Sequence, residues 1–217
     1  MFESRQPSWD AKVSVMAEPR LDFFPRAREE ADVTAMPSGT IRYVELTPAE
    51  FRQRLPESLN LYVQAMRYPA GTAEQRAPMW LAHMLRDGWR NVTALDADGT
   101  MIGLAYGYRG QPGQWWHEQV RAGLVARGEP TDALHDYFEL TELHVRPDSQ
   151  GSGIGEELLR SLLDGQQLPR VLLSTPEGPS RAWRLYRRLG FTDVLRHYRF
   201  AGDPRPFAIL SRTLPLD

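Results

Sequence analysis

A glycine-rich turn between an apolar strand and an amphipathic helix constrains the fold of this chain more than any other feature. Residues 137–145 combine aromatic and β-branched side chains, which is typical of a strand. The turn at 150–155 has glycine at every second position. Apolar residues then recur at helical spacing from Ile154 to Leu163. A strand–turn–helix unit of this kind predicts an α/β chain.

The turn also predicts a site for a phosphate group. Glycine adopts positive φ and lets a ligand approach the backbone, and the N–H groups at a helix N-terminus lack helical partners and carry positive partial charge. Together these features suit a pyrophosphate. A Walker loop would end in Gly-Lys-Ser/Thr and a Rossmann fingerprint would read Gly-x-Gly-x-x-Gly, and neither fits here. A tight turn without a ligand is the alternative.

The remaining pattern is mixed. We expect six to seven strands in a mixed sheet flanked by about four helices, an α/β (mixed α+β) class with an insert at 109–136 before the strand at 137–145. Residues 1–40 lack sustained periodicity and are expected to be an extension, partly disordered or packed on the domain at 41–217. Further strands are expected at 41–46, 91–95, 101–108, 171–174, 191–200 and 207–214, and further helices at 47–66, around 79–84, at 114–127 and at 180–189.

Composition excludes several classes of protein. The 217 residues carry 26 Lys and Arg against 28 Asp and Glu, so broad binding to nucleic acid or to anionic membranes is not expected. No apolar run approaches the roughly 20 residues of a membrane span, and the polar N-terminus resembles no signal peptide, which favours a cytoplasmic location. The chain has no cysteine, which excludes disulfides and thiolate chemistry. No histidine pair has metal-ligand spacing, so no metal site is expected.

Two segments resemble a known enzyme family. Leu143-x-Val145-x-Pro147-x-x-Gln150-x-x-Gly153-x-Gly155 resembles the acyl-CoA loop of the GNAT superfamily of N-acetyltransferases. Downstream, Ala182-x-x-Leu185-Tyr186-x-x-x-Gly190-Phe191 resembles a second element of that family. The resemblance implies a GNAT-like sheet and acetyl-CoA as cosubstrate, without a metal. One departure is Pro179, where the family often has asparagine, and Ser180 beside it is expected to replace some of its hydrogen bonding.

The resemblance also implies which residues hold the cosubstrate. Backbone amides at the end of the strand would bind the pantetheine arm and the carbonyl oxygen, the glycine turn would bind the pyrophosphate, and Ser180 and Tyr186 would complete the site. In sequence order the cosubstrate residues are Leu143, His144, Val145, Gln150, Gly151, Ser152, Gly153, Ile154, Gly155, Ser180 and Tyr186.

Acetyl transfer to an amine requires a base, because an alkyl amine has a pKa of about 10.4. Without cysteine, direct attack by the amine is the economical route, as the resemblance also implies. Glu139 matches the position of the catalytic glutamate in the protein-lysine branch of the family, and Glu142 is either a base or a contact for a cationic substrate. Residues three apart on a strand point to opposite faces unless a bulge intervenes. Tyr186 would act as an acid through a lowered pKa, or as a hydrogen-bond donor to sulfur.

The acceptor is expected to be a primary amine of a small molecule or a protein, on a monomer or homodimer. Trp115 and Trp116 in the insert would form an aromatic wall for the acceptor or pin the insert to the sheet. Other activities stay open: transfer of a longer acyl group, a catalytically silent acyl-CoA sensor, or a domain that only mediates oligomerisation.

Overall fold

A computed structural model describes residues 40–69, 71–201 and 203–216, so the extension expected at 1–40 lies outside the described residues except for Thr40. Seven strands form one sheet in this part of the chain, in the order β1-β2-β3-β4-β5-β7-β6. The strands are β1 (Arg42–Val44), β2 (Arg90–Leu95), β3 (Met101–Gly110), β4 (Tyr137–Val145), β5 (Arg170–Pro176), β6 (Thr192–Tyr198) and β7 (Phe207–Thr213).

Six α-helices flank the sheet in the described ranges, against the expected number of about four. The segment expected at 47–66 is divided into two helices, and the helix expected at 114–127 in the insert is present. They are α1 (Pro48–Gln53), α2 (Leu55–Met66), α3 (Thr72–His83), α4 (Trp115–Ala126), α5 (Ile154–Leu163) and α6 (Arg181–Arg188). Thr47 and Glu50 form a capping box that starts α1, and Pro56 lies in the first turn of α2, where the missing N–H costs nothing. No helix in these ranges is long and apolar enough to cross a membrane.

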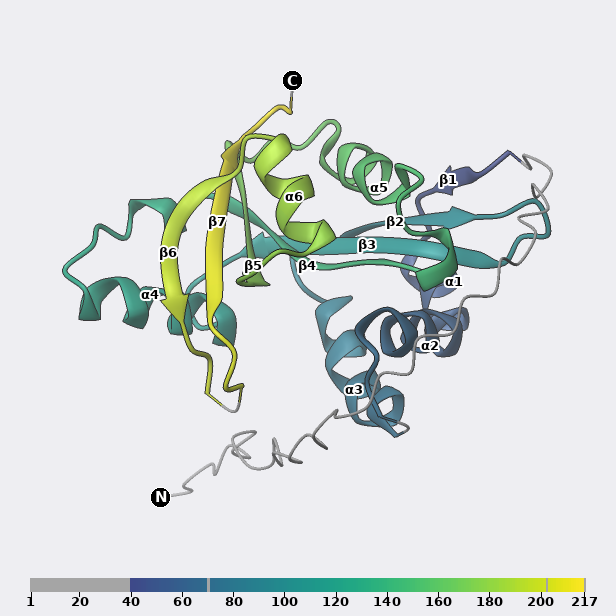
Figure 1. The fold of residues 1–217 in the computed structure, drawn as a ribbon, viewed down its shortest axis with the longest axis horizontal. Coiled ribbons are helices and arrows are strands. Elements are labelled where there is room, and N and C mark those ends of the chain that lie inside the picture. Colours follow the sequence, from purple (N-terminus) through teal and green to yellow (C-terminus); the bar gives the residue numbers. More distant parts are fainter. Residues whose placement is uncertain (1–39, 70, 202, 217) are drawn as a thin grey trace, which may run out of the picture.

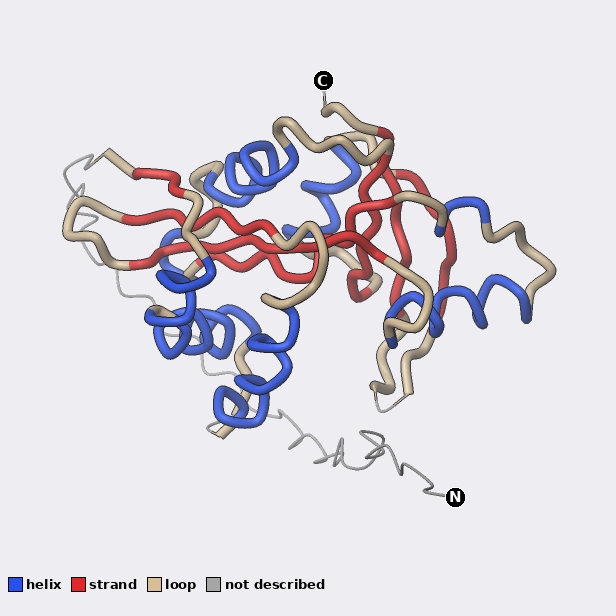
Figure 2. The backbone as a smooth tube through the Cα atoms, turned by 180° about the vertical axis from the view of Figure 1, so that it is seen from behind, coloured by secondary structure: helices blue, strands red, loops and turns tan. Residues whose placement is uncertain are grey.

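The helices form two layers, one on each face of the sheet (Figures 1 and 2). Helices α5 and α6 cover one face, where Leu158, Leu159 and Tyr186 share a core cluster with residues of β2 to β5. The opposite face is covered in two places. Helices α1 to α3 pack on β2 and β3 around Phe51 and Trp80, and α4 packs near β5, β6 and β7.

The sheet divides between β4 and β5. This parallel pair is registered only at Tyr137, Phe138 and Glu139, whereas β4 is registered with β3 along its whole length. In Figure 1, β2 to β4 run across the page while β5 to β7 run up and down it. As a result, residues 142–145 of β4 have a strand partner on one edge only.

A β-bulge in β4 lies beside this division. Tyr106 is registered with Glu142 and Gly107 with Leu140, so Thr141 has no opposite residue on β3. The bulge brings the backbones close together: a Cβ added at Gly107 would lie 2.2 Å from the carbonyl oxygen of Glu139. A glycine is therefore required opposite the bulge.

Candidate active site

The bulge places the two candidate glutamates on one face of the sheet. Residues registered across a strand pair share a face, so Glu139 lies beside Tyr108 and Glu142 beside Tyr106. Tyr106 and Tyr108 are two apart on β3 and point the same way. Residues three apart on a regular strand would point to opposite faces, and the bulge at Thr141 is what brings these two to the same face. Both carboxylates therefore face the layer formed by α1 to α3 and α4.

Glu139 is buried, with 3% of its surface exposed. The Tyr108 hydroxyl donates a hydrogen bond to its Oε1 at 3.0 Å, while Oε2 is buried without a hydrogen-bond partner. Burial raises the pKa of Glu139 to about 7, against the opposing effects of the Tyr108 hydrogen bond and the Arg86 charge. A carboxyl group in this state can accept and release a proton near neutral pH.

Glu142 has different surroundings. Its carboxylate lies 2.5 Å from Nε2 of His144, two residues along the same face, and the His144 ring contacts Tyr62 edge-on with centroids 5.0 Å apart. Burial is the main cause of the raised pKa of Tyr62, Tyr106 and Tyr186, and the Glu142 charge contributes to each. The three hydroxyls are therefore neutral, and the one hydrogen-bond contact described for the Glu142 side chain is with His144.

Of the two roles expected for Tyr186, an acid with a lowered pKa or a hydrogen-bond donor to sulfur, the surroundings of its hydroxyl favour the second. Tyr186 is buried on α6 with its ring 5.4 Å from that of Phe191, and burial raises the pKa of its hydroxyl well above the usual value. The nearby Glu142 charge acts in the same direction. A phenol in this environment donates a hydrogen bond more readily than it gives up its proton.

The far half of β4 presents backbone groups at an open edge. Arg146 N donates to Ile102 O on β3 at 2.9 Å. Backbone directions alternate along a strand, so the amides of Leu143 and Val145 turn to the opposite edge, where no strand is registered, and that of His144 turns to β3. Gln150 Nε2 reaches the carbonyl of Val145 at 2.9 Å, in agreement with this direction.

The glycine turn leads from this edge into α5. Gly151 and Gly153 have φ of 92° and 89°, and a Cβ added at either would meet nothing within 4 Å. The first helical donors, Glu156 N and Glu157 N, both bond to Gly153 O, so the amides before them lie outside the helical ladder. Arg181 Nη1 donates to Gln150 Oε1 at 2.8 Å and adds positive charge at the turn.

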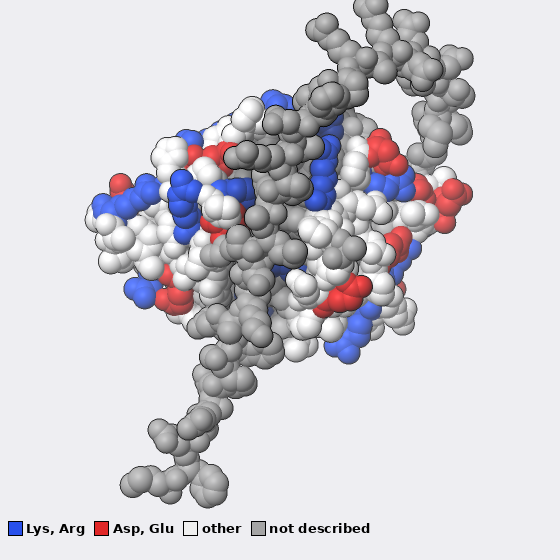
Figure 3. All heavy atoms as spheres, turned by 60° about the horizontal axis from the view of Figure 1, so that its bottom comes forward, with Lys and Arg blue, Asp and Glu red and all other residues white. Residues whose placement is uncertain are grey.

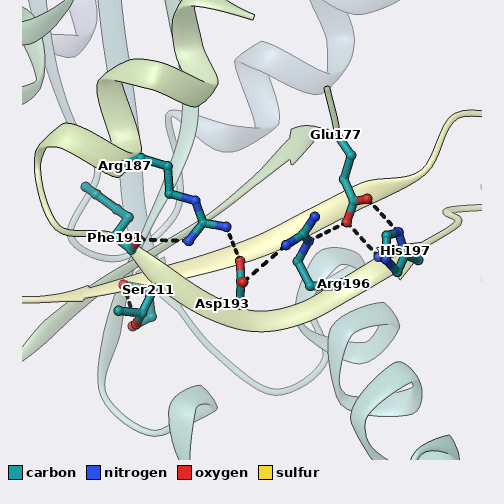
Figure 4. Close-up of polar contacts among 8 residues, drawn as sticks. Glu177, Arg187, Phe191, Asp193, Arg196, His197 and Ser211 are labelled. Carbon is teal, nitrogen blue, oxygen red and sulfur yellow. Dashed lines mark hydrogen bonds and ion pairs between the residues drawn. The ribbon is translucent and has the colours of Figure 1, made fainter. Parts of the chain in front are cut away.

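A polar network fixes the position of α6 (Figure 4). Arg187 bonds to Phe191 O at 3.1 Å and pairs with Asp193, which also contacts Arg196. Arg196 Nε in turn bonds at 2.7 Å to Glu177, in the loop that precedes α6. The last turn of α6 and the loop that precedes α6 are thereby tied to β6.

The Ser180 hydroxyl accepts a hydrogen bond from Trp183 N at 3.0 Å and caps the N-terminus of α6. This contact fixes the side chain at the start of α6, and its expected contact with the cosubstrate stays a prediction. Ser152 likewise donates to Ser149 O at 2.6 Å within the turn.

The two insert tryptophans differ. Trp116 is 8% exposed, packs near Tyr137 and donates from Nε1 to Ser174 Oγ at 3.1 Å, so it pins α4 to the sheet. Trp115 is 52% exposed, with its ring 5.6 Å from that of Phe200. A cavity of about 650 Å³ opens elsewhere along the insert, lined by residues that include Arg109, His117 and Asp136 but neither Glu139 nor Glu142.

Sequence reasoning missed Tyr108 and Arg86. Tyr108 holds Glu139, and the Arg86 guanidinium lies over the Tyr108 ring, 4.5 Å from its centroid. Alternation of Tyr106 and Tyr108 with glycines in a predicted strand was a signal for an aromatic face. Arg86, in the segment after α3, carries no such signal.

Charges of both signs are interspersed on the visible parts of the face that bears α1 to α4 (Figure 3). Within the described ranges no group of three His, Cys, Asp or Glu residues is arranged to hold a metal ion.

Comparison with known proteins identifies the family. The family model described as "Acetyltransferase (GNAT) domain" matches residues 97–193. The "GCN5-like protein acetyltransferase Rv2170" of Mycobacterium tuberculosis (strain ATCC 25618 / H37Rv) is 52% identical over 201 residues, covering 80% of this chain and 98% of the relative. This chain belongs to the GNAT acetyltransferase family.

Solved GNAT structures share the fold at low sequence identity. The ribosomal-protein-S18-alanine N-acetyltransferase of Escherichia coli superimposes with a TM-score of 0.56 and 16% identity over 82% of this chain and 96% of that one. Mutant forms of the spermidine/spermine N-acetyltransferase SpeG of Vibrio cholerae superimpose with a TM-score of 0.52 and 16% identity, over 80% of this chain and 95% of that one. The PaiA N-acetyltransferase of Thermoplasma acidophilum, in complex with coenzyme A, superimposes with a TM-score of 0.53 and 14% identity, over 81% of this chain and 99% of that one. The GNAT chain described here thus has the general fold of these N-acetyltransferases.

Proposed function

We propose that this GNAT chain is an acetyl-CoA-dependent N-acetyltransferase that moves the acetyl group directly to a primary amine. The observation that carries the proposal is the buried Glu139 carboxylate, which has a pKa near 7 and one unpartnered oxygen and lies where β4 separates from β5. Its position beside an open strand edge suits a base that works next to a bound thioester.

The residues present fit acetyl-CoA. The amides of Leu143 and Val145 would bind the pantetheine arm at the open edge of β4, and the amides of 150–155 would bind the pyrophosphate at the α5 N-terminus. His144 would contribute through its side-chain contact with Glu142. When bound, acetyl-CoA supplies an activated acetyl thioester.

Each side chain then has a separate task. Glu139 accepts the proton that the amine loses as its nitrogen gains the acetyl group, directly or through one water. An amide of the open edge donates to the carbonyl oxygen, where negative charge develops. Tyr186 donates a hydrogen bond to the departing sulfur, a role compatible with its raised pKa. The chain has no cysteine, so no acyl-cysteine intermediate enters this route.

We infer that the acceptor is a lysine side chain or the N-terminus of a protein, since the 52% identical relative is named as a protein acetyltransferase. A polyamine-like small molecule is the second class, and Glu142 would attract the cationic form of either acceptor. The cytoplasmic location and the monomeric or homodimeric state stay predictions.

The test is release of free CoA from acetyl-CoA with a panel of lysine peptides, peptide N-termini and polyamines. Wild-type protein should release CoA with at least one amine, Glu139→Gln should lose most of that rate, and Tyr186→Phe should lose less. Assays with a longer acyl-CoA define the donor. Binding of acetyl-CoA without release for any amine would contradict the transferase proposal and identify an acyl-CoA sensor.

A further inference from the structure

We infer that Tyr108 and Arg86 are positioning residues that set the protonation state of Glu139: Tyr108 holds one carboxylate oxygen, and Arg86, over the face of that ring, supplies the positive charge that favours the ionised form. The inference rests on the proposed role of Glu139 as the base and names two residues outside the family motifs of this sequence that would tune it.

The contact between Tyr108 and Glu139 is fixed by the sheet. The two residues are registered across β3 and β4, and both are buried, so the hydroxyl donates to Oε1 at 3.0 Å within the protein interior. Oε2 is left buried and without a partner. The hydrogen bond therefore orients the carboxylate and leaves one oxygen to exchange the proton.

Arg86 completes the arrangement from the segment after α3. Its guanidinium carbon lies 4.5 Å from the Tyr108 ring centroid, and no hydrogen bond or ion pair of this side chain is present in the described part of the chain. A cation that no carboxylate neutralises acts more strongly on nearby charges in a partly buried site. Its charge lowers the pKa of both Tyr108 and Glu139, against the larger effect of burial.

The other groups near Glu139 carry little positive charge. Burial raises the pKa of Tyr106 and Tyr137, so both hydroxyls are neutral. Burial lowers the pKa of His83 to about 3 and also lowers that of His117, which bonds to Tyr137. The next carboxylate along this face is Glu142, which contacts His144. Among these neighbours of Glu139, Arg86 is therefore the side chain that carries a positive charge near neutral pH.

The chain offers matched controls for both residues. Tyr106 lies two positions before Tyr108 on the same face of β3, but its hydroxyl contacts His83 Nδ1 at 3.0 Å and not Glu139. Arg76 lies on α3, where its charge lowers the pKa of His83 and Tyr62 but is not among the causes of the Glu139 pKa shift. Arg86→Lys keeps the charge and removes the planar group.

The experiment is a pH titration of the Glu139 carboxyl carbon by NMR in full-length protein labelled with ¹³C-glutamate, assigned with Glu139→Gln. Tyr108→Phe should raise the Glu139 pKa by about one pH unit, since a hydrogen bond to a charged group contributes about 1.5 kcal/mol. Arg86→Gln should also raise the Glu139 pKa, and Arg86→Lys should keep most of the wild-type value. The controls Tyr106→Phe and Arg76→Gln should leave the Glu139 pKa within about 0.3 units of wild type.

An unchanged Glu139 pKa in both Tyr108→Phe and Arg86→Gln would overturn the inference, as would an equal change in the two controls. If the buried Tyr108→Phe variant does not fold, as judged by circular dichroism, the Arg86 series decides alone. The titration needs no turnover. A correct pKa pattern without acetyl transfer would therefore contradict the proposed function only, and acetyl transfer without the pattern would contradict this inference only.

Discussion

The two halves of β4 differ in what they offer a substrate. Residues 137–139 have strand partners on both edges, so their backbone groups are used in the sheet and only side chains such as Glu139 are available. Residues 142–145 have a partner on one edge, so backbone amides are available as well. The bulge at Thr141 separates the two. In the proposed reaction, one short strand would thus supply a proton acceptor from one half and hydrogen-bond donors from the other.

The largest expected effect comes from a substitution in the first half of β4, residues 137–139, which offers side chains alone. Glu139→Gln should lower kcat/KM for the amine acceptor by about 10²–10⁴-fold, the usual contribution of a general base. Binding of acetyl-CoA should be unchanged, because the amides of the other half are intact. Initial rates of CoA release, with calorimetric titration of acetyl-CoA as the control, measure both. Equal loss of binding and rate would mean that the two halves are not separate.

The same substitution should change stability in a pH-dependent way. Burial raises the Glu139 pKa in the folded state from an ordinary 4.5 to about 7. Its favourable contribution is therefore complete below about pH 4.5 and is lost as pH rises through 7. The free energy of unfolding of Glu139→Gln should exceed that of wild-type protein by about 3 kcal/mol at pH 8 and by little at pH 4.5, since 1.36 kcal/mol corresponds to one pKa unit. Urea unfolding at both pH values measures the gap, and a gap independent of pH would refute the raised pKa.

Glu142→Gln sharpens the comparison between the two carboxylates. If Glu142 attracts a cationic acceptor, its loss should raise KM for the amine about tenfold and change kcat little, the pattern of lost ground-state binding. Steady-state kinetics with the best acceptor from the panel separate the two constants. A fall in kcat as large as that of Glu139→Gln would make Glu142 a second base.

The smallest effect concerns Ser180. Because its hydroxyl caps α6, Ser180→Ala should cost about 1 kcal/mol of unfolding free energy. The affinity for acetyl-CoA should stay within about twofold, in line with a structural role. Thr47→Ala, which removes the cap of α1, is the matched control for stability. A tenfold loss of acetyl-CoA affinity in Ser180→Ala alone would show that Ser180 contacts the cosubstrate, as the sequence predicts.

The sequence predicted the elements whose patterns are local. The bounds of β4 at 137–145 match the expected strand, and α5 begins at Ile154 after the glycine turn, because alternation, glycine and helical spacing are written in consecutive residues. The strands expected at 91–95 and 101–108 are present as β2 and β3 for the same reason.

The surroundings of the glutamates were not predictable in this way. Tyr108 reaches Glu139 across 31 positions of sequence, and Arg86 comes from a third segment. The bulge that aligns Glu139 with Glu142 had one trace in the sequence, Gly107 in a strand interior. The sign of the Tyr186 pKa change followed from burial, which no local pattern reveals.

Calorimetric titration of acetyl-CoA tests the central claim, that the open edge of β4 and the glycine turn form the cosubstrate site. Wild-type protein should bind with one site per chain. Gly153→Trp should lose at least about 100-fold in affinity, because the new side chain would occupy the space beside the α5 N-terminus. Gly99→Trp places the same side chain at φ 79° in the distant turn between β2 and β3 and should bind as wild-type does. Equal binding by all three folded proteins would contradict the account.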